Sequence, residues 1–324
     1  MMKVKRVMWA VAVMTALSGL ALPALADDSL RVHFIDVGHG DCIFIQTPDD
    51  GIPNNGRAEG YRVLIDAGET RYSHDYPVTY LKELGLRRGD RIDYVVATHL
   101  DADHVGGLPT VYDSFHVLNT IEPGYEYSKG PARSFRTAAC RESLEGSTFW
   151  CDPVKSGLIT KLGDKLKLGN ELEVRLLFYD ATPGKVDTRT NASSIVLRIR
   201  YGSVSFLLMG DAPKAVEESL LARYGNKLKS TVLKVGHHGS KTASGKAFLK
   251  TVSPRYAVIC AGRRHHLPNP TVIALLMDTC CADLWRTDDN DVEEHKTSTT
   301  AYGDDNILFT TDGKNPRPNV RWNR

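Results

Sequence analysis

Hydrophobic and polar residues alternate along residues 30–37, and this period of two predicts a strand with one buried face. Other short apolar runs, bounded by turn residues, predict further strands. They cover residues 42–46, 62–65, 92–97, 172–178, 194–200, 204–209, 231–235 and 256–260, with two more near Trp285 and Ile307. Helical patterns cover residues 77–84, 107–115, 215–223, 245–252 and 271–279. Strands first, then alternating strands and helices, indicate a sandwich of two sheets with helices on its outer faces.

Residues 123–164 interrupt this pattern and are predicted to form an irregular insertion. They contain Cys140 and Cys151, which flank a polar loop of ten residues. In an oxidising compartment these two cysteines are predicted to form a disulfide. Residues 27–324 otherwise show no internal repeat and no dividing linker, so they are predicted to form one large domain.

The amino-terminal segment has the pattern of a secretory signal peptide. Three of the first six residues are basic, an apolar run covers residues 7–22, and Ala24 and Ala26 form an A-x-A cleavage signal. The sequence therefore predicts removal of residues 1–26 and export to the periplasm or the medium. An uncleaved anchor is the alternative. No other segment is long and apolar enough to span a bilayer, so no integral membrane domain is expected.

The charge of the predicted mature chain is almost balanced. The whole sequence has 41 Lys and Arg against 39 Asp and Glu, and the predicted signal peptide removes three of the basic residues. The net charge is then about −1, so no basic field surrounds the protein. Any binding of nucleic acid must depend on a local group of basic side chains.

The densest group of metal-binding side chain types directly follows the strand predicted at residues 92–97. His99, Asp101, Asp103 and His104 fall within six residues, with the spacing H-x-D-x-D-H. His99 and Asp101 are two apart, so they can point the same way from extended backbone. Asp103 and His104 lie past the bend and can point to a second, adjacent position. Mixed imidazole and carboxylate ligands suit zinc, manganese or iron better than calcium.

Three further strand ends carry polar residues that the fold alone does not explain. Asp211 could bridge two metals through its two oxygens, or cap the next helix. Asp66 could orient a ligand histidine through a hydrogen bond, or be an ordinary turn aspartate. His237 and His238 are adjacent and cannot both point the same way from extended backbone, so one is predicted to bind metal while the other faces the substrate. Two surface histidines are the alternative.

Together these residues have the number of ligands that a two-metal site needs. The sequence therefore predicts two divalent metal ions, zinc or manganese. The predicted ligands are His99, Asp101, Asp103, His104, Asp211 and one of His237 and His238.

The order of these motifs resembles the metallo-β-lactamase superfamily and, within it, the hydrolase domain of ComEC-type competence proteins. Phosphorylcholine-esterase-like enzymes of the superfamily are similar too. The resemblance covers nearly all of residues 27–324. The matching segments are residues 36–41, 66–68, 98–107, 191–194, 210–211, 237–240, 286–288 and 311–313.

The resemblance implies an αββα sandwich with the metals at one edge of the two sheets. It assigns His99 and Asp101 to one metal, Asp103 and His104 to the other, and Asp211 to the bridge between them. It implies a set of residues that surround the ligands. These are Asp36, Asp66, Thr98 and Asn191.

Two positions depart from the family pattern. The family usually has Gln where His39 stands, and a loop substitution without contact to the site is the preferred interpretation, with contact as the alternative. Competence-type domains often have a His-Pro pair late in the chain, whereas this sequence has Leu267 before Pro268. His265 or His266 could replace the missing histidine.

The function predicted from the resemblance is that of an exported phosphodiesterase or nuclease, with DNA as one candidate substrate. A metal-bound hydroxide would attack phosphorus. Asp103 would also orient the attacking water, and His237 or His238 would contact the phosphate or protonate the leaving group. Nearby basic residues could contact a polyanionic backbone, or simply be solvated. These are Lys234, Lys241, Lys246, Arg263 and Arg264.

Two other function classes stay open. The same metal centre could hydrolyse a small ester, a lactone or a β-lactam. A secreted metal-binding or partner-binding module without turnover is the non-enzymatic alternative, which a complete ligand set disfavours.

Overall fold

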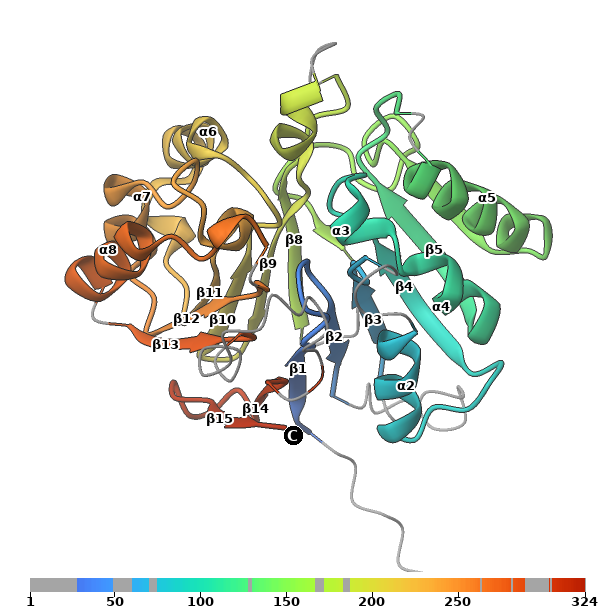
Figure 1. The fold of residues 1–324 in the computed structure, drawn as a ribbon, viewed down its shortest axis with the longest axis horizontal. Coiled ribbons are helices and arrows are strands. Elements are labelled where there is room, and N and C mark those ends of the chain that lie inside the picture. The colour runs from blue at the N-terminus through green and yellow to red at the C-terminus, as the bar shows by residue number, and fades with distance from the viewer. Residues whose placement is uncertain are drawn as a thin grey trace, which may run out of the picture.

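Two sheets pack face to face, and helices cover the outer face of each (Figure 1). The structure is a computed structural model. It describes residues 28–48, 60–69, 75–127, 130–166, 172–182, 187–262, 264–280, 282–288, 303 and 305–323. The predicted αββα sandwich is confirmed. The predicted signal peptide, residues 1–26, lies outside the described residues.

The first sheet has eight strands in the order β15-β14-β1-β2-β3-β4-β5-β6. Its strands are β1 (Leu30–Phe34), β2 (Ile43–Gln46), β3 (Arg62–Ile65), β4 (Arg91–Val96), β5 (His116–Glu122), β6 (Thr148–Cys151), β14 (Ile307–Thr311) and β15 (Asn319–Trp322). The helices on its outer side are α2 (Tyr76–Glu83), α3 (Ala102–Val105), α4 (Leu108–Ser114) and α5 (Gly130–Leu144).

The second sheet has seven strands in the order β13-β12-β11-β10-β9-β8-β7. Its strands are β7 (Lys165–Leu166), β8 (Leu172–Phe178), β9 (Val196–Tyr201), β10 (Val204–Leu208), β11 (Val232–Lys234), β12 (Tyr256–Ile259) and β13 (Asp283–Arg286). Its outer helices are α6 (Lys214–Tyr224), α7 (Lys246–Val252) and α8 (Pro270–Cys280). Short 3₁₀ helices occur at Asp187–Ser193, Gly225–Leu228, Gly236–Gly239 and Arg264–His266.

Alternation along the strands divides the apolar side chains into three layers. In β2, Ile43 and Ile45 face the other sheet, whereas Phe44 faces the helices. The same alternation in the second sheet directs Leu207 toward its own outer helices. This period of two is the reason why the sequence pattern predicted a sandwich so well. Among the described residues, no helix is long and apolar enough to cross a bilayer.

Parallel pairing brings the loops with the predicted ligands to one edge of the sandwich. β3 is parallel to β4, and β10 is parallel to β11. The carboxyl ends of parallel strands meet at the same edge of a sheet, where ligands commonly bind. Asp66, His99, Asp211 and His237 follow β3, β4, β10 and β11 in that order.

The prediction that residues 123–164 are irregular is wrong for much of this segment. It contains the 15-residue helix α5 and the strand β6, which pairs in parallel with β5 and extends the first sheet. The buried face of α5 consists mostly of alanines around Phe135. Such small side chains give a weak hydrophobic period, so the helix was missed.

The predicted disulfide between Cys140 and Cys151 is also wrong, because both are free thiols in the structure. Cys140 lies near the end of α5 and Cys151 ends β6. A strand rises about 3.3 Å per residue and a helix about 1.5 Å, so the returning strand carries Cys151 past Cys140. The Cys151 thiol instead donates to Glu122 Oε1 at 3.0 Å.

His33 in β1 should make the stability of the fold depend on pH. Burial is the main cause that lowers the pKa of His33 to about 4, whereas an unfolded chain binds this proton near pH 6.5. Because the unfolded state is protonated first, stability that is present above pH 6.5 is lost as the pH falls through 4. This contribution is about 3 kcal/mol, at ~1.36 kcal/mol per pKa unit.

Urea unfolding of the native protein and of His33→Phe, each at pH 7 and at pH 4, measures this contribution. The difference in free energy of unfolding between the two proteins should change by about 3 kcal/mol across that range. A difference that is the same at both pH values would contradict the prediction. Comparing the two proteins cancels the titration of all other groups.

Candidate metal centre

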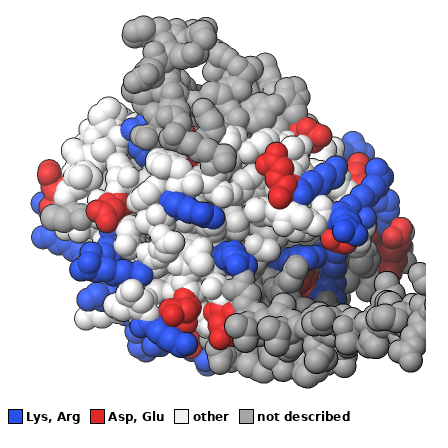
Figure 2. All heavy atoms as spheres, turned by 90° about the horizontal axis from the view of Figure 1, so that it is seen from below, with Lys and Arg blue, Asp and Glu red and all other residues white. Residues whose placement is uncertain are grey.

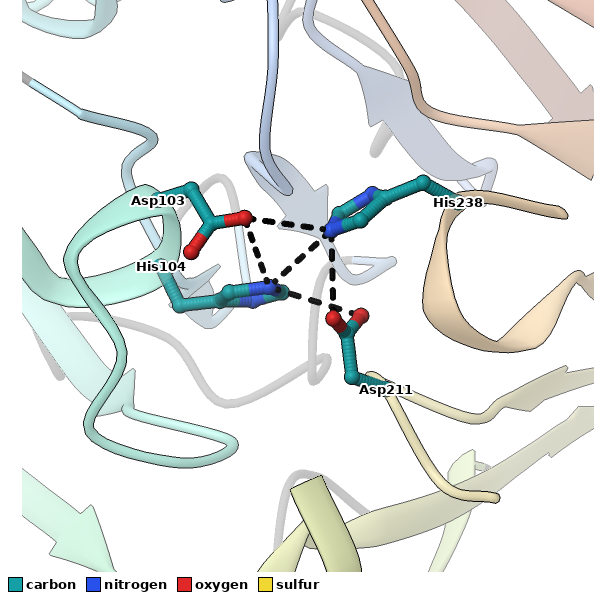
Figure 3. A group of neighbouring side chains, drawn as sticks. All are labelled: Asp103, His104, Asp211 and His238. Carbon is teal, nitrogen blue, oxygen red and sulfur yellow. Dashed lines mark hydrogen bonds and ion pairs between the residues drawn. The ribbon is translucent and has the colours of Figure 1, made fainter. Parts of the chain in front are cut away.

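Four of the predicted ligands converge on one point at the sheet edge, as Figure 3 shows. His238 Nε2 lies 3.2 Å from Asp211 Oδ2 and 3.4 Å from Asp103 Oδ2. His104 Nε2 lies 3.3 Å from His238 Nε2 and 3.4 Å from Asp211 Oδ1. Two imidazole nitrogens and two carboxylates around one point form the donor set expected for a divalent transition metal. We call these four residues the buried cluster.

The pKa values in the buried cluster are shifted by mutual attraction of its members. Burial lowers the pKa of His238, but Asp211 and Asp103 outweigh it and raise that pKa to about 10. Burial also opposes protonation of His104, yet Asp211 and Asp66 hold its pKa well above the usual value. The carboxylates therefore require positive charge between them. Protons on the two histidines supply it in a metal-free chain, and a cation would replace those protons.

His99 and Asp101 lie beside the buried cluster and form a second donor pair. The rings of His99 and His104 are 4.0 Å apart between centroids, and His99 Nε2 lies 3.7 Å from Asp101 Oδ2. Thr190 and Tyr127 each donate a hydroxyl hydrogen bond to Asp101, at 2.9 and 3.3 Å. His99 Nε2 is buried and has no hydrogen-bond partner among the described residues. A cation at this pair would provide the missing partner.

Backbone conformation separates the two adjacent histidines. His237 and His238 both have positive φ values, 49° and 50°, which non-glycine residues rarely adopt. Their ring centroids are 6.2 Å apart. His238 turns into the buried cluster, whereas the His237 side chain is 26% exposed and lies beside Thr242 and Asn191. The structure therefore places His238 with the predicted ligands and leaves His237 facing solvent.

Three of the four residues that the resemblance placed around the ligands contact histidines of the site. Asp66 Oδ2 lies 2.8 Å from His104 Nδ1 and accepts a hydrogen bond from Thr98 Oγ1 at 2.6 Å. This leaves Nε2 of His104 free to face the cluster. Asn191 Nδ2 lies 3.2 Å from His237 Nε2. Asp36 accepts backbone hydrogen bonds from Gly38 and Gly303.

His39 reaches the site, so its interpretation as a loop substitution without contact is wrong. Its Nε2 lies 3.3 Å from Asp103 Oδ2, and its ring centroid is 4.7 Å from that of His238. His265 packs edge-to-face against His39, with ring centroids 5.6 Å apart. The sequence signal for this contact was that His39 departs from the family pattern. Sequence spacing alone could not show which way its loop folds.

Gly40 is the reason why this loop can come so close. Its φ is +128°, and a Cβ at this position would lie 2.1 Å from the backbone oxygen of Asp103. Only glycine fits such an approach. The backbone N–H of Asp41 donates to the same oxygen at 3.3 Å. The loop is thereby attached to the first turn of α3, where Asp103 and His104 lie.

A buried ion pair under the cluster was missed from the sequence. Lys234 is fully buried, and its Nζ lies 2.5 Å from Asp41 Oδ2 and donates to Gly210 O at 3.1 Å. Lys234 is therefore unavailable for the predicted contact with a polyanion. Lys241 and Lys246 are exposed. Arg263 and the side chain of Arg264 lie outside the described residues.

The local charges balance for two divalent cations. Five carboxylates have an oxygen within 4.0 Å of a ring nitrogen of His99, His104 or His238. Lys234 and two divalent cations together carry five positive charges. Buried charges are stable only when they are paired, so this donor set fits a binuclear site better than a single ion. The five are Asp41, Asp66, Asp101, Asp103 and Asp211.

Comparison with known families agrees with this geometry. The sequence model of the metallo-beta-lactamase superfamily matches residues 36–263, a range that contains all the ligands described above. The chain belongs to the metallo-β-lactamase superfamily. Membership, fold and the His/Asp cluster together support a hydrolase that binds two divalent metals.

Competence proteins are among the superfamily members that this chain resembles in sequence, as predicted. ComE operon protein 3 of Bacillus subtilis is 29% identical over 292 residues, which cover 85% of this chain and 34% of the relative. Competence protein ComA of Neisseria gonorrhoeae is 29% identical over 263 residues, or 81% of this chain and 31% of the relative. The chain thus spans about a third of the length of these relatives.

Solved structures of the superfamily are more distant. Zinc-bound PqqB of Methylobacterium extorquens has a TM-score of 0.45 and 12% identity, and the alignment covers 78% of this chain and 97% of PqqB. Igni18, a metallo hydrolase from Ignicoccus hospitalis, has a TM-score of 0.44 and 12% identity, with coverage of 79% and 94%. These likenesses concern the fold alone.

Proposed function

We propose that this protein is an exported, binuclear metal-dependent phosphodiesterase that acts on nucleic acid. The observation that carries the proposal is the pair of adjacent donor groups at one sheet edge, with a local charge that two divalent cations would balance. Zinc and manganese both suit these ligands. The sequence pattern of residues 1–26 supports export.

The names of the relatives favour nucleic acid as the substrate class. Two are named competence or ComE operon proteins, and Recombination protein 2 of Haemophilus influenzae is 27% identical over 245 residues. The distribution of surface charge is consistent with contact between nucleic acid and small groups of basic side chains, but not with a broad basic surface. On the face drawn in Figure 2, Lys and Arg are interspersed with Asp and Glu, without a broad field of one sign.

When bound, two divalent cations supply a water of lowered pKa and positive charge beside the phosphoryl oxygens. Asp211 would hold a metal ion in the buried cluster, because its Oδ1 lies 3.4 Å from His104 Nε2 and its Oδ2 lies 3.2 Å from His238 Nε2. Asp103 would orient the attacking water, and His39 Nε2 fixes that carboxylate through a 3.3 Å contact with Oδ2, the oxygen that also faces His238. Pre-oriented groups of this kind act without reorganising during the reaction.

His237 is proposed to contact the phosphate or to protonate the leaving group. Its ring is the more exposed of the two adjacent histidines, and its Nδ1 is held 2.7 Å from Thr242 Oγ1. That contact leaves Nε2 directed toward Asn191 and Asp211. A partly exposed ring that is fixed through Nδ1 and has Nε2 directed toward Asp211 suits proton transfer.

A substrate panel tests the proposed function directly. The protein, loaded with zinc or with manganese, is assayed on a bis-aryl phosphodiester, single-stranded DNA, duplex DNA, an aryl ester, a lactone and a β-lactam. Hydrolysis of the phosphodiesters, and its loss in chelator, is the expected result. If the protein hydrolyses lactones or β-lactams but none of the phosphodiesters, the proposal is wrong and the protein is a lactone or β-lactam hydrolase.

Replacement of His237 should separate catalysis from metal binding. His237→Ala is expected to lower kcat on the bis-aryl phosphodiester by about 10²–10⁴-fold, the usual contribution of a general acid. Metal content should stay at about two ions per chain, because His238 and not His237 belongs to the buried cluster. His116→Ala, at a partly exposed histidine of β5 that contacts Glu142 outside the site, is the matched control. Loss of one metal equivalent in His237→Ala would contradict the assignment.

A further inference from the structure

The outer face of the second sheet carries a group of cationic side chains away from the metal centre. Along β9, Leu197 and Ile199 face the core between the sheets, so Arg198 and Arg200 point outward. Arg175 in β8 lies directly opposite Arg198 in the register. These side chains, with Glu173, Tyr224 and Lys227, line a cavity of about 450 Å³. We call it the outer cavity.

Negative charge in the outer cavity is too small to balance these cations. Glu173 is the carboxylate that lines it, and Arg175 Nε and Lys165 Nζ already bind that carboxylate at 2.7 and 2.9 Å. Within the described part of the chain, Arg198, Arg200 and Lys227 form no ion pair. Like charges directly opposite each other in neighbouring strands, as Arg175 and Arg198 are, destabilise a sheet.

Arg198 is also incompletely hydrogen-bonded. One end of its guanidinium is fixed, since Nη2 donates to Lys229 O at 3.0 Å. Its Nε is buried and has no partner among the described residues. Burial, with the neighbouring Arg200, lowers the pKa of Arg198 below its usual value. A buried N–H of a charged group normally has an acceptor, and an anion in the outer cavity would provide one.

We propose that the outer cavity is an oxyanion site that binds a phosphate group, either from a nucleic-acid chain or as free phosphate. Arginine presents several N–H donors in a rigid fork, which matches the oxygens of a phosphate. Arg198 and Arg200 supply two such forks, and Lys227 adds a point charge. The Tyr224 ring in the wall offers an apolar surface on which a base can stack. This site is independent of the proposed phosphodiesterase function.

Direct binding to the metal-loaded protein tests the proposal. The probes are inorganic phosphate and a fluorescent single-stranded 20-nucleotide DNA with phosphorothioate linkages, which resists cleavage. The variant Arg198→Gln/Arg200→Gln removes two cations from the outer cavity. Lys82→Gln/Arg87→Gln is the matched control, because it removes the same charge from exposed positions next to the other sheet. Lys227→Gln provides a second, single-site variant in case the double variant does not fold.

In the cavity variant, the Kd for DNA is expected to rise about tenfold at low salt relative to the control. The slope of log affinity against log salt should become shallower by about 1.4, at ~0.7 for each phosphate contact with a single strand. Loss of phosphate-induced thermal stabilisation with unchanged DNA affinity would support the site and identify free phosphate as its ligand. Binding of both probes equal to that of the control would overturn the proposal.

The same variants distinguish this site from the metal centre. Their hydrolysis of the bis-aryl phosphodiester, which is too small to reach both sites, should equal that of the native protein. If the native protein hydrolyses no phosphodiester, the binding measurements still decide whether the outer cavity holds phosphate.

Discussion

Asp103→Ala is expected to lower kcat on the bis-aryl phosphodiester by about 10³-fold or more and to remove about one of the two metal ions. Asp103 is a member of the buried cluster, with its Oδ2 3.4 Å from His238 Nε2. The same oxygen lies 3.3 Å from His39 Nε2. Its loss would remove a proposed metal ligand and the group that we propose orients the attacking water. Elemental analysis and steady-state kinetics on the folded variant measure the two effects.

The matched control is Asp113→Ala. Asp113 is 63% exposed in α4 and pairs only with the exposed Arg141 among the described residues. Surface ion pairs of this kind contribute about 0–1 kcal/mol, so the control should keep both metals and full activity. If Asp103→Ala keeps two metals and normal turnover while circular dichroism shows a native fold, the assignment of the cluster is wrong.

Lys234→Met should reduce the free energy of unfolding by about 3–5 kcal/mol, the usual cost of leaving a buried charge without its partner. Lys234 and Asp41 are both buried, and they join the loop after β1 to the end of β11. The pair therefore connects the two sheets directly beneath the metal centre. Urea unfolding in the presence of a chelator isolates this effect from metal binding.

A double variant makes this prediction specific. Lys234→Met/Asp41→Asn removes both charges, so it should be more stable than Lys234→Met alone. Lys82→Met at an exposed position of α2 should change stability by less than about 0.5 kcal/mol. Equal stability of Lys234→Met and the native protein would show that the ion pair does not hold the sheets together.

Most of the fold was predictable from the sequence, because the alternation of buried and exposed side chains follows directly from strand geometry. The segment that failed, α5, lacks large apolar side chains apart from Phe135, so its period was too weak to detect. The false disulfide had a similar origin. Cys140 and Cys151 are close in sequence, but Cys140 lies in a helix and Cys151 in a strand. Because the two elements have a different rise per residue, closeness in sequence does not bring the two thiols together.

The sequence by itself indicated most of the residues that we propose as ligands of the metal centre. His99, Asp101, Asp103 and His104 are local to the loop after β4 in the first sheet, whereas Asp211 follows β10 in the second sheet. Local spacing at a strand end constrains side-chain direction within a few residues, so no long-range information was needed for the four residues of that loop.

Only the tertiary structure decided which residues contact the proposed ligands from outside, and which of the two adjacent histidines stays exposed. The choice between His237 and His238 depends on two consecutive positive φ values, which no spacing rule implies. The contacts of His39 with Asp103, and of Lys234 with Asp41, join residues 64 and 193 positions apart in the chain. The first contact arises from the order of the strands within the first sheet, and the second arises from the packing of the two sheets against each other. A one-dimensional pattern of hydrophobic and polar residues carries no record of either arrangement.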